Sequence, residues 1–330
     1  DTSLTIANDL SGNLTTLGDV TMNGTGIGTL GNSGTLTANG AITASGAVTS
    51  SGDFALGNNA FEQTNLASAF EVTGGTVTVG TGTFIGGAMD VSGGSFTQTG
   101  DNGVNTQSAA SIAVSGGGSV EWDAGVDGGT LAVGTVTGTV TYNNKSVTFT
   151  ADNTISGVFY DLTINGGVTV TAGGALRILR NMTIDGSYTN GGETLTFGGT
   201  NSVDGGTITD NSGGPQNLGD VTINATGQTK NTSGNVLTQT LDISAGTLSL
   251  GGNVTANGAV TNSGTIAVGG NTFTATGGGI TSTGTVTTTS GTIDANGTID
   301  ILTVNTGATI DGDTSLTIAN DLSGNLTTLG

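Results

Sequence analysis

The chain of 330 residues contains no cysteine and no histidine, and it has a single proline, Pro215. The absence of cysteine excludes a disulfide framework, a thiol nucleophile and a thiolate metal site, so the fold is indifferent to the redox compartment. The absence of histidine excludes imidazole as a general acid or base. Any catalysis would therefore have to depend on carboxylates.

Positive charge is also scarce. The chain has 24 acidic residues and only four basic ones, Lys145, Arg177, Arg180 and Lys230, so its net charge is −20. Nucleic-acid binding requires a basic stripe that displaces counterions from phosphates, and four scattered cations cannot supply one. An anionic membrane surface would repel the chain, and no run of ~18 apolar residues exists to span a bilayer. The acidic residues are spread singly, which indicates a solvated, self-repelling surface.

Aromatic residues make up only 4% of the chain and charged residues only 8%. Glycine contributes 63 of the 330 residues, several times its usual share of ~7%. Disordered chains can have such a composition. However, 33% of the residues are apolar and regularly spaced, which disorder does not require. We therefore expect a folded chain with a thin core.

Apolar residues recur at every sixth position in several segments. The clearest is 34–56, with Leu36, Ile42, Val48 and Phe54, and with Gly40, Gly46 and Gly52 between them. The same spacing returns as Leu248, Val254, Val260 and Ile266, and, with one extra residue, as Ile280, Val286, Ile293 and Ile299. Apolar residues alternate with threonine as in a strand, and glycine suits the bends. This spacing is too short for a sandwich or barrel, whose turns recur every 8–12 residues or so.

Short strands joined by bends, with no helical segment between them, predict an all-β parallel β-solenoid with about three strands per coil. At 18–20 residues per coil, a uniform solenoid would have about 16–17 coils in 312 residues. Phenylalanines 54, 61, 70, 84 and 96 are expected to extend one column as stacked rings. Segment 58–71 lacks glycine and is expected to be a bulging loop or a helical turn, and segment 200–217 is expected to be a loop.

The first 18 residues, DTSLTIANDLSGNLTTLG, recur unchanged as residues 313–330. A match of this length does not arise by chance, and a duplicated motif inside one domain would have drifted. We therefore expect 1–312 to be one full repeat unit of a continuous solenoid and 313–330 to begin the next identical repeat. Such a solenoid would be uncapped at both ends and would continue by stacking, either in a covalent tandem chain or between head-to-tail subunits.

Several repeats also carry a family resemblance. NSGTLTANGAIT (32–43) and NSGTIAVGG (262–270) resemble the repeats of filamentous-haemagglutinin-type exoproteins. FYDLTINGGVTVTAGGAL (159–176) and GGSFTQTG (93–100) resemble those of giant bacterial surface and autotransporter-like proteins. The resemblance implies a right-handed parallel β-helix displayed outside a bacterial cell. Stalk repeats of these families carry no catalytic residues, so it implies no active site.

Carboxylates supply the remaining candidates for chemistry. Within EWDAGVD (121–127), Glu121 and Asp123 would share one strand face, where two carboxylates could act on a sugar. We favour the simpler interpretation of a solvated outer face with Trp122 buried. Oxygen ligands for structural calcium occur at Asp204, Asp210, Asn211, Asp311 and Asp313, but the repeated nonapeptide of calcium-binding solenoids is missing.

Thr-x-Thr triplets occur at 35–37, 76–78, 148–150 and 169–171. A flat face with one triplet per coil can bind ice, but the uneven intervals between these triplets do not demand such a face. Outward threonine simply suits a strand.

The sequence therefore predicts a structural protein, with no enzymatic activity, catalytic residue, metal site or cofactor. We expect an extracellular filament or stalk at the cell surface whose partner is another copy of itself, end to end, with no nucleic acid and no membrane insertion. Two alternatives stay open. One is an adhesin that binds a surface or glycan ligand through loops such as 58–71 or 200–217. The other is a carbohydrate-active β-helix enzyme that uses Glu121 and Asp123.

Overall fold

The computed structural model describes residues 4–6, 14–16, 20–99, 107–123, 130–138, 140–199, 205–305, 307–311, 315–324 and 327–328. Within these ranges every regular element is a β-strand, and no helix is present. Parallel strands stack as a β-solenoid of about 14 turns, which confirms the predicted fold class. The handedness of the coil stays a prediction. No helix able to cross a membrane is found in the described ranges.

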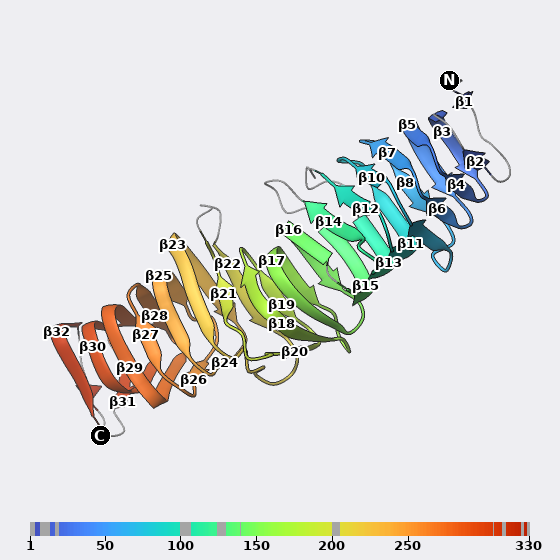
Figure 1. The fold of residues 1–330 in the computed structure, drawn as a ribbon. Helices are drawn as coiled ribbons and strands as arrows, with labels where there is room; N and C mark the ends of the chain where they lie inside the picture. The colour runs from blue at the N-terminus through green and yellow to red at the C-terminus, as the bar shows by residue number, and fades with distance from the viewer. Residues whose placement is uncertain are drawn as a thin grey trace. The chain divides into compact units, whose positions relative to one another are not determined.

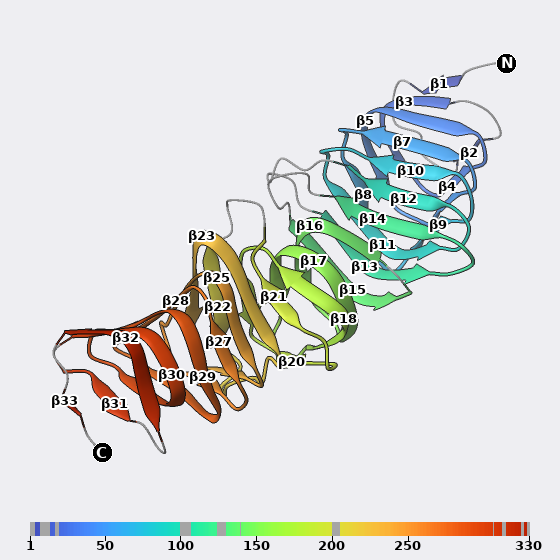
Figure 2. The ribbon, with the colours of Figure 1, turned by 60° about the vertical axis from the view of Figure 1, so that its left-hand side comes forward.

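The chain divides into two compact units (Figures 1 and 2), Asp1–Asn153 with Val158–Tyr160, and Thr154–Gly157 with Asp161–Gly330. The first unit contains β1 (Leu4–Ile6), β2 (Leu14–Thr16), β3 (Val20–Ile27), β4 (Leu30–Asn32), β5 (Thr35–Ala44), β6 (Val48–Ser50), β7 (Asp53–Gly57), β8 (Phe61–Gln63), β9 (Ala69–Val72), β10 (Thr76–Val79), β11 (Phe84–Val91), β12 (Ser95–Gln98), β13 (Gln107–Val114), β14 (Ser119–Asp123), β15 (Thr130–Thr137) and β16 (Val140–Phe149). β17 (Asn153–Ile164) has residues in both units. The second unit contains β18 (Thr169–Ile178), β19 (Met182–Ile184), β20 (Ser187–Thr189), β21 (Leu195–Phe197), β22 (Gly206–Asp210), β23 (Val221–Ser233), β24 (Val236–Thr238), β25 (Leu241–Ser249), β26 (Val254–Ala256), β27 (Val260–Asn262), β28 (Thr265–Gly269), β29 (Thr272–Thr288), β30 (Thr292–Val304), β31 (Thr309–Asp311), β32 (Leu316–Gly324) and β33 (Thr327–Thr328).

Strands pair in parallel with the strand one coil away, so a register can be followed along each unit. In the first unit one register runs through Leu4, Val20, Leu36, Phe54, Val77, Phe96, Val120 and Val140. In the second unit a register runs through Leu176, Leu195, Val221, Leu241, Val260, Ile280, Gly297 and Leu316. Each register takes seven steps, so a coil holds about 20 residues, the upper end of the predicted range.

The apolar residues at six-residue spacing form the core. All twelve residues that carry this spacing in the three segments are buried, from Leu36 to Phe54, from Leu248 to Ile266 and from Ile280 to Ile299. Burial alternates along short strands such as β10 and β28, with threonine on the less buried side. Each coil therefore has three sides with inward side chains. When coils stack, the inward side chains on one side form a continuous row, which we call a wall.

The aromatic residues of the first unit pack differently from the prediction of a single column of stacked rings. Phe54 and Phe96 belong to one wall, Phe61 and Phe84 to a second, and Phe70 to a third. Only the Phe61–Phe84 pair is stacked, with ring centroids 5.3 Å apart, and the other contacts among these five rings are edge-on. The single-column prediction was wrong because rings from three walls converge at the centre of the coil.

Segment 58–71 is only partly a loop, and it contains no helical turn. β8 and β9 lie within it, and both Phe61 and Phe70 are fully buried. Between them, Asn65 closes a turn by accepting hydrogen bonds from the amides of Ala67 (3.2 Å, to Oδ1) and Ser68 (2.9 Å, to the carbonyl). The prediction failed because the buried side chains of Phe61 and Phe70 hold this segment in strands although it contains no glycine.

Segment 200–217 is also mixed. Residues 200–204 lie outside the described residues, and β22 occupies 206–210 with Ile208 buried. The described part of the predicted loop is 211–217, and Pro215 is exposed within it.

A polar corner motif recurs in both units. It consists of an inward polar residue, a serine or threonine, and a glycine, and it occurs at 32–34, 50–52, 262–264 and 282–284. The side chain of Asn262 donates to Ser282 Oγ at 2.9 Å, and Ser282 Oγ donates to the carbonyl of Gly284 at 3.1 Å. Asn32 and Ser50 form the same ladder at 3.2 Å. These bonds satisfy polar groups that the coil buries.

Glycine is required at this corner because successive turns approach closely. A Cβ on Gly264 would lie 2.3 Å from the carbonyl oxygen of Gly246 in the preceding coil. Gly264→Ala is therefore expected to lower the free energy of unfolding by about 1–3 kcal/mol. Gly214 is the matched control, because a Cβ there meets nothing within 4 Å. Chemical denaturation of both variants checks this, and equal stability of the two would contradict the close-approach argument.

Candidate functional site

Only Glu121 of the predicted carboxylate pair has a described side chain, so the pair stays a prediction. Glu121 lies on β14 in register with Thr97 and Thr141, so its described neighbours in the row carry no second carboxylate. Trp122 is fully buried and packs 4.9 Å from the ring of Phe96, as the simpler interpretation expects. The side chain of Asp123 and the whole of Asp127 lie outside the described residues.

The described calcium candidates make other contacts. Asp210 accepts hydrogen bonds from Ser212 and from the amide of Gln216, and Asn211 donates to Asp185 at 2.8 Å. Asp311 is exposed, whereas Asp204 and Asp313 lie outside the described residues. Within the described ranges no three histidine, cysteine, aspartate or glutamate side chains come together to hold a metal ion.

Outward threonines do form rows, which the uneven sequence intervals had hidden. One row runs through Thr37, Ala55, Thr78, Thr97 and Glu121, so alanine and glutamate interrupt it. An unbroken row of Thr229, Thr247, Thr265 and Thr285 occurs in the second unit. Its companion row is Asn231, Ser249, Ala267 and Thr287, so Thr-x-Thr is complete in only one of these coils. These rows do not make the repeated double row that an ice-binding face requires.

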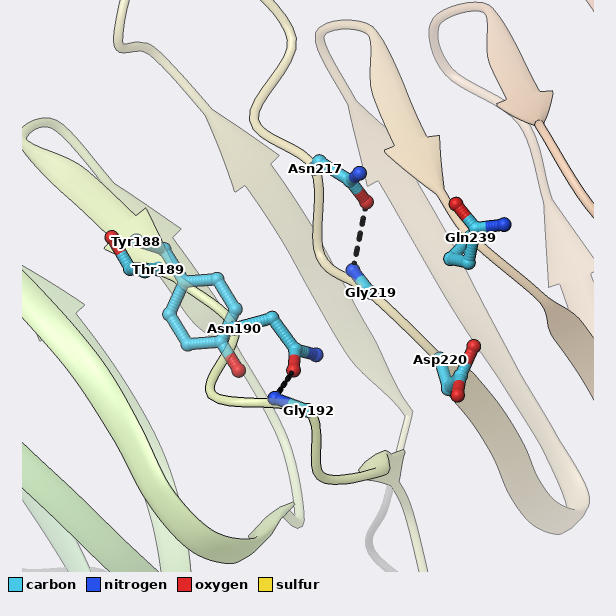
Figure 3. Close-up of a pocket in the computed structure, with 8 residues that line it drawn as sticks. All are labelled: Tyr188, Thr189, Asn190, Gly192, Asn217, Gly219, Asp220 and Gln239. Atoms are coloured by element: carbon cyan, nitrogen blue, oxygen red, sulfur yellow. Dashed lines mark hydrogen bonds between the residues drawn. The ribbon is translucent and has the colours of Figure 1, made fainter.

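A pocket of about 440 Å³ lies in the second unit (Figure 3). Its described lining is polar, with Tyr188, Asn190, Asn217, Asp220 and Gln239 as its principal side chains. Tyr188 belongs to β20, and Asn190 follows that strand directly. Asn217 and Asp220 lead into β23, and Gln239 follows β24. The coil winding thus brings together residues from three successive turns of the chain.

Three hydrogen bonds position the side chain of Asn190 at the pocket. Its Nδ2 donates to the carbonyls of Glu193 (3.1 Å) and Leu218 (2.7 Å), and its Oδ1 accepts from the amide of Gly192 (2.6 Å). Asn217 Oδ1 accepts from the amide of Gly219 at 2.9 Å, and Figure 3 shows both amide contacts. These carboxamides fold the local backbone into turns, which is a common use of asparagine.

The 211–217 loop beside the pocket is fixed by its own side chains. The Asp210 carboxylate accepts from the amides of Ser212 (3.0 Å) and Gln216 (2.7 Å). Gln216 Nε2 donates to Ser212 Oγ at 3.0 Å, and Ser187 Oγ on β20 donates to Gln216 Oε1 at 3.4 Å. The loop is therefore held against β20 before any ligand arrives.

Tyr188 is the most buried side chain of the pocket lining, with 4% of its surface exposed. Its hydroxyl makes no hydrogen bond within the described residues, and in Figure 3 the ring extends towards the turn of Asn190 and Gly192. Burial raises the pKa of Tyr188 to about 12, so the phenol is neutral and keeps its proton at physiological pH.

Three other groups at the pocket keep hydrogen-bonding capacity. Asn217 Nδ2 and the carboxamide of Gln239 make no hydrogen bond within the described residues, and both side chains are exposed. Asp220 uses one carboxylate oxygen to accept from Thr240 Oγ1 at 2.8 Å, which leaves the second oxygen as an acceptor. These residues could not be predicted as a group, because no spacing or motif in the sequence connects them.

Comparison with protein-family models, with curated proteins and with solved structures gives no match to this chain. The resemblance to filamentous-haemagglutinin-type and autotransporter-like repeats therefore receives no support beyond the shared type of fold.

Proposed function

We propose that this chain is a structural protein, a section of an extracellular filament or stalk that grows by continuous stacking of solenoid coils. Its partner in this role is a further copy of the same repeat, joined in a tandem chain. The proposal assigns it no enzymatic activity and no cofactor. The resemblance of its repeats to bacterial surface proteins is the support for a place at the cell surface.

The observation that carries this proposal is the geometry of the duplicated segment. In the first copy, Leu4–Ile6 pairs in parallel with the strand that follows it, at Val20–Met22. In the second copy, Leu316–Ile318 pairs in parallel with the strand that precedes it, at Gly297–Ile299. Because the two copies are identical in sequence, one coil of this sequence is able to pair on both sides. A tandem chain would use both pairings at once.

The last described turn carries an apolar residue that a further coil could cover. Leu302 lies between Val286 and Leu322 in its register and is 1% exposed. Leu322 pairs with Leu302 on one side and is 47% exposed. A following coil would bury Leu322, and each buried CH₂ group contributes about 0.8 kcal/mol. The strand edge of β32 would gain backbone hydrogen bonds from the same contact.

The filament proposal predicts an axial repeat. Strands stack ~4.8 Å apart, so a 312-residue period of about 20 residues per coil would rise by about 75 Å. Electron microscopy of a chain with several joined units should show a continuous fibre with this period. Denaturing electrophoresis separates the two modes of assembly, because a band of one unit would exclude the covalent tandem chain. Discrete particles one unit long would overturn the filament itself.

A matched pair of substitutions tests the junction between repeat units, here called the seam, in a chain of two joined units. Ile318 pairs with Ile299 and is half-buried, whereas its neighbour Thr317 is exposed. Ile318→Asp should make the seam sensitive to protease and should break fibres there, whereas Thr317→Asp should leave both unchanged. Equal protease resistance of both variants would show that the seam is not stacked.

One alternative function keeps a specific observation in its favour. An adhesin needs a ligand site on the outside of the solenoid, and the polar pocket beside the 211–217 loop is such a place. The enzyme alternative stays a prediction, because Glu121 lies between two threonines in its row and the side chain of Asp123 lies outside the described residues.

A further inference from the structure

We infer that the pocket formed by Tyr188, Asn190, Asn217, Asp220 and Gln239 binds a neutral saccharide, either a free mono- or disaccharide or the end of a longer glycan. This inference does not depend on the filament function. It gives a site and a ligand class to the adhesin alternative. A filament that carries this pocket once per 312-residue unit would present the site at regular intervals.

The size of the pocket fits this ligand class. Its volume of about 440 Å³ lies in the lower part of the range for small-molecule sites, about 300–1,000 Å³. A mono- or disaccharide fits such a volume, whereas a folded protein domain or a long peptide would need a larger surface.

The free polar groups match hydroxyls better than other functional groups. A sugar hydroxyl both donates and accepts a hydrogen bond, so it pairs best with a mixture of donors and acceptors. Within the described residues, Asn217 Nδ2 is a free donor, the second oxygen of Asp220 is a free acceptor, and the Gln239 carboxamide supplies one of each kind. Neighbouring hydroxyls on one sugar ring could satisfy all three side chains together.

Charge selects a neutral ligand. Asp220 is the charged side chain of the described lining, and no lysine or arginine is among the lining residues that the structure describes. A phosphate, a sulfate or an acidic sugar would place an anion beside this carboxylate without a compensating cation. A divalent cation would find one carboxylate here, and no described group of three metal-ligating side chains exists.

The pocket is also organised before binding. Asn190 is held by three hydrogen bonds, and the Asp210 carboxylate holds both ends of the 212–216 segment. Ligand binding therefore has to order only the exposed side chains of Asn217 and Gln239. A smaller ordering cost leaves more of the interaction energy for affinity, which suits a shallow site with few contacts.

The direct test is saturation-transfer NMR on the full chain. The neutral probes are the methyl glycosides of glucose, galactose, mannose and N-acetylglucosamine, and N-acetylneuraminic acid is the anionic probe. We expect transfer to at least one neutral probe and none to the anionic probe. If the same sugar within a soluble polysaccharide gives stronger transfer than the free glycoside, the ligand is a glycan end. If the free glycoside is equal or better, the ligand is a small sugar.

Two substitutions and a matched control locate the binding. Gln239→Ala removes a side chain that makes no hydrogen bond within the described residues, and Asn217→Asp removes the donor but keeps the oxygen that accepts from Gly219. Each should weaken binding about ten-fold. Asn257 is the control, because it follows Ala256 just as Gln239 follows Thr238 one coil earlier, is exposed and lies outside the described lining. Asn257→Ala should bind like the unchanged chain.

Three outcomes would overturn the inference. They are no transfer to any neutral probe, equal transfer in all three variants, and preference for the anionic probe. Microscopy of the same variants keeps the two proposals apart, because the pocket substitutions should leave filaments intact. Intact filaments without sugar binding would remove the pocket inference alone, whereas sugar binding without filaments would remove the structural proposal alone.

Discussion

Replacing Phe84 with alanine is expected to lower the free energy of unfolding of the surrounding coils by about 3–5 kcal/mol. Phe84 is fully buried at the point where the three walls of the first unit meet. Its ring centroid lies 5.3 Å from that of Phe61, 5.4 Å from Phe70 and 5.0 Å from Phe96, and it also contacts Trp122. Alanine would leave a cavity that these rings, fixed to separate strands, cannot fill.

The expected loss is local, because each coil of a solenoid contacts only its neighbours. Native-state hydrogen exchange resolves it, with amides of β8, β11 and β13 exchanging faster and amides of the second unit unchanged. Leu66→Ala is the control, since Leu66 is 47% exposed in the loop between β8 and β9. A loss below about 1 kcal/mol for Phe84→Ala would show that the ring cluster repacks, contrary to the present argument.

The part of the fold that the sequence predicts is the part with regular coils. Leu36, Ile42 and Val48 are spaced six apart because each faces inward from a different side of one coil, and Phe54 repeats the position of Leu36 in the next coil. All four are buried as predicted. The prediction fails where coils carry insertions. Segment 58–71 departs from the six-residue spacing, so its strands were not recognised although Phe61 and Phe70 are inward.

Inward polar residues are a second reason for failure. Gln63 occupies a fully buried position on β8, where the pattern leads one to expect an apolar residue. Its Nε2 donates to the carbonyls of Gly46 at 2.8 Å and Ala69 at 2.9 Å, and its Oε1 accepts from the amide of Gly87 at 2.9 Å. Such a residue is acceptable in the core only because the backbone of neighbouring turns satisfies it. Those partners are known only once the turns are placed.

The candidate site was beyond sequence analysis for the same physical reason. Asn190, Asn217 and Gln239 come from successive turns. β21 and β22 separate the first two in sequence, and β23 and β24 separate the last two. Asn217 was within a predicted loop, which did indicate the region. The partners of that loop on β20 and after β24 depend on the coil register, which the sequence does not contain.

The lysines give the second large expected effect, because Lys145 and Lys230 are both fully buried. Lys230 occupies an inward position, where it pairs with Gly206 in one adjacent coil and with Leu248 in the other. Gly206 has no side chain, so the lysine reaches across it towards the preceding turns. There its ammonium group donates to the carbonyls of Leu179 (2.6 Å), Arg180 (2.9 Å) and Gly205 (2.9 Å).

Lys230→Met should therefore cost about 3 kcal/mol or more, because three buried carbonyls would lose their donor at about 1–3 kcal/mol each. Replacing a buried ion pair by apolar residues is often harmless when both partners are replaced. Here the partners are backbone carbonyls, which no substitution can remove. The change should appear as faster hydrogen exchange in β19, β22 and β23.

Thr229→Met is the matched control for Lys230→Met, since Thr229 is the adjacent residue of β23 and is exposed. It should leave exchange in these strands nearly unchanged. Amine acetylation gives an independent measurement, because a fully buried ammonium group reacts only when its turn opens. Acetylation of Lys230 in the unchanged chain should therefore proceed at the rate of local opening and should speed up in denaturant. Two results would contradict this argument: Lys230 reacting as fast as an exposed amine, or Lys230→Met being as stable as Thr229→Met. Either would show that the ammonium group does not stabilise these turns.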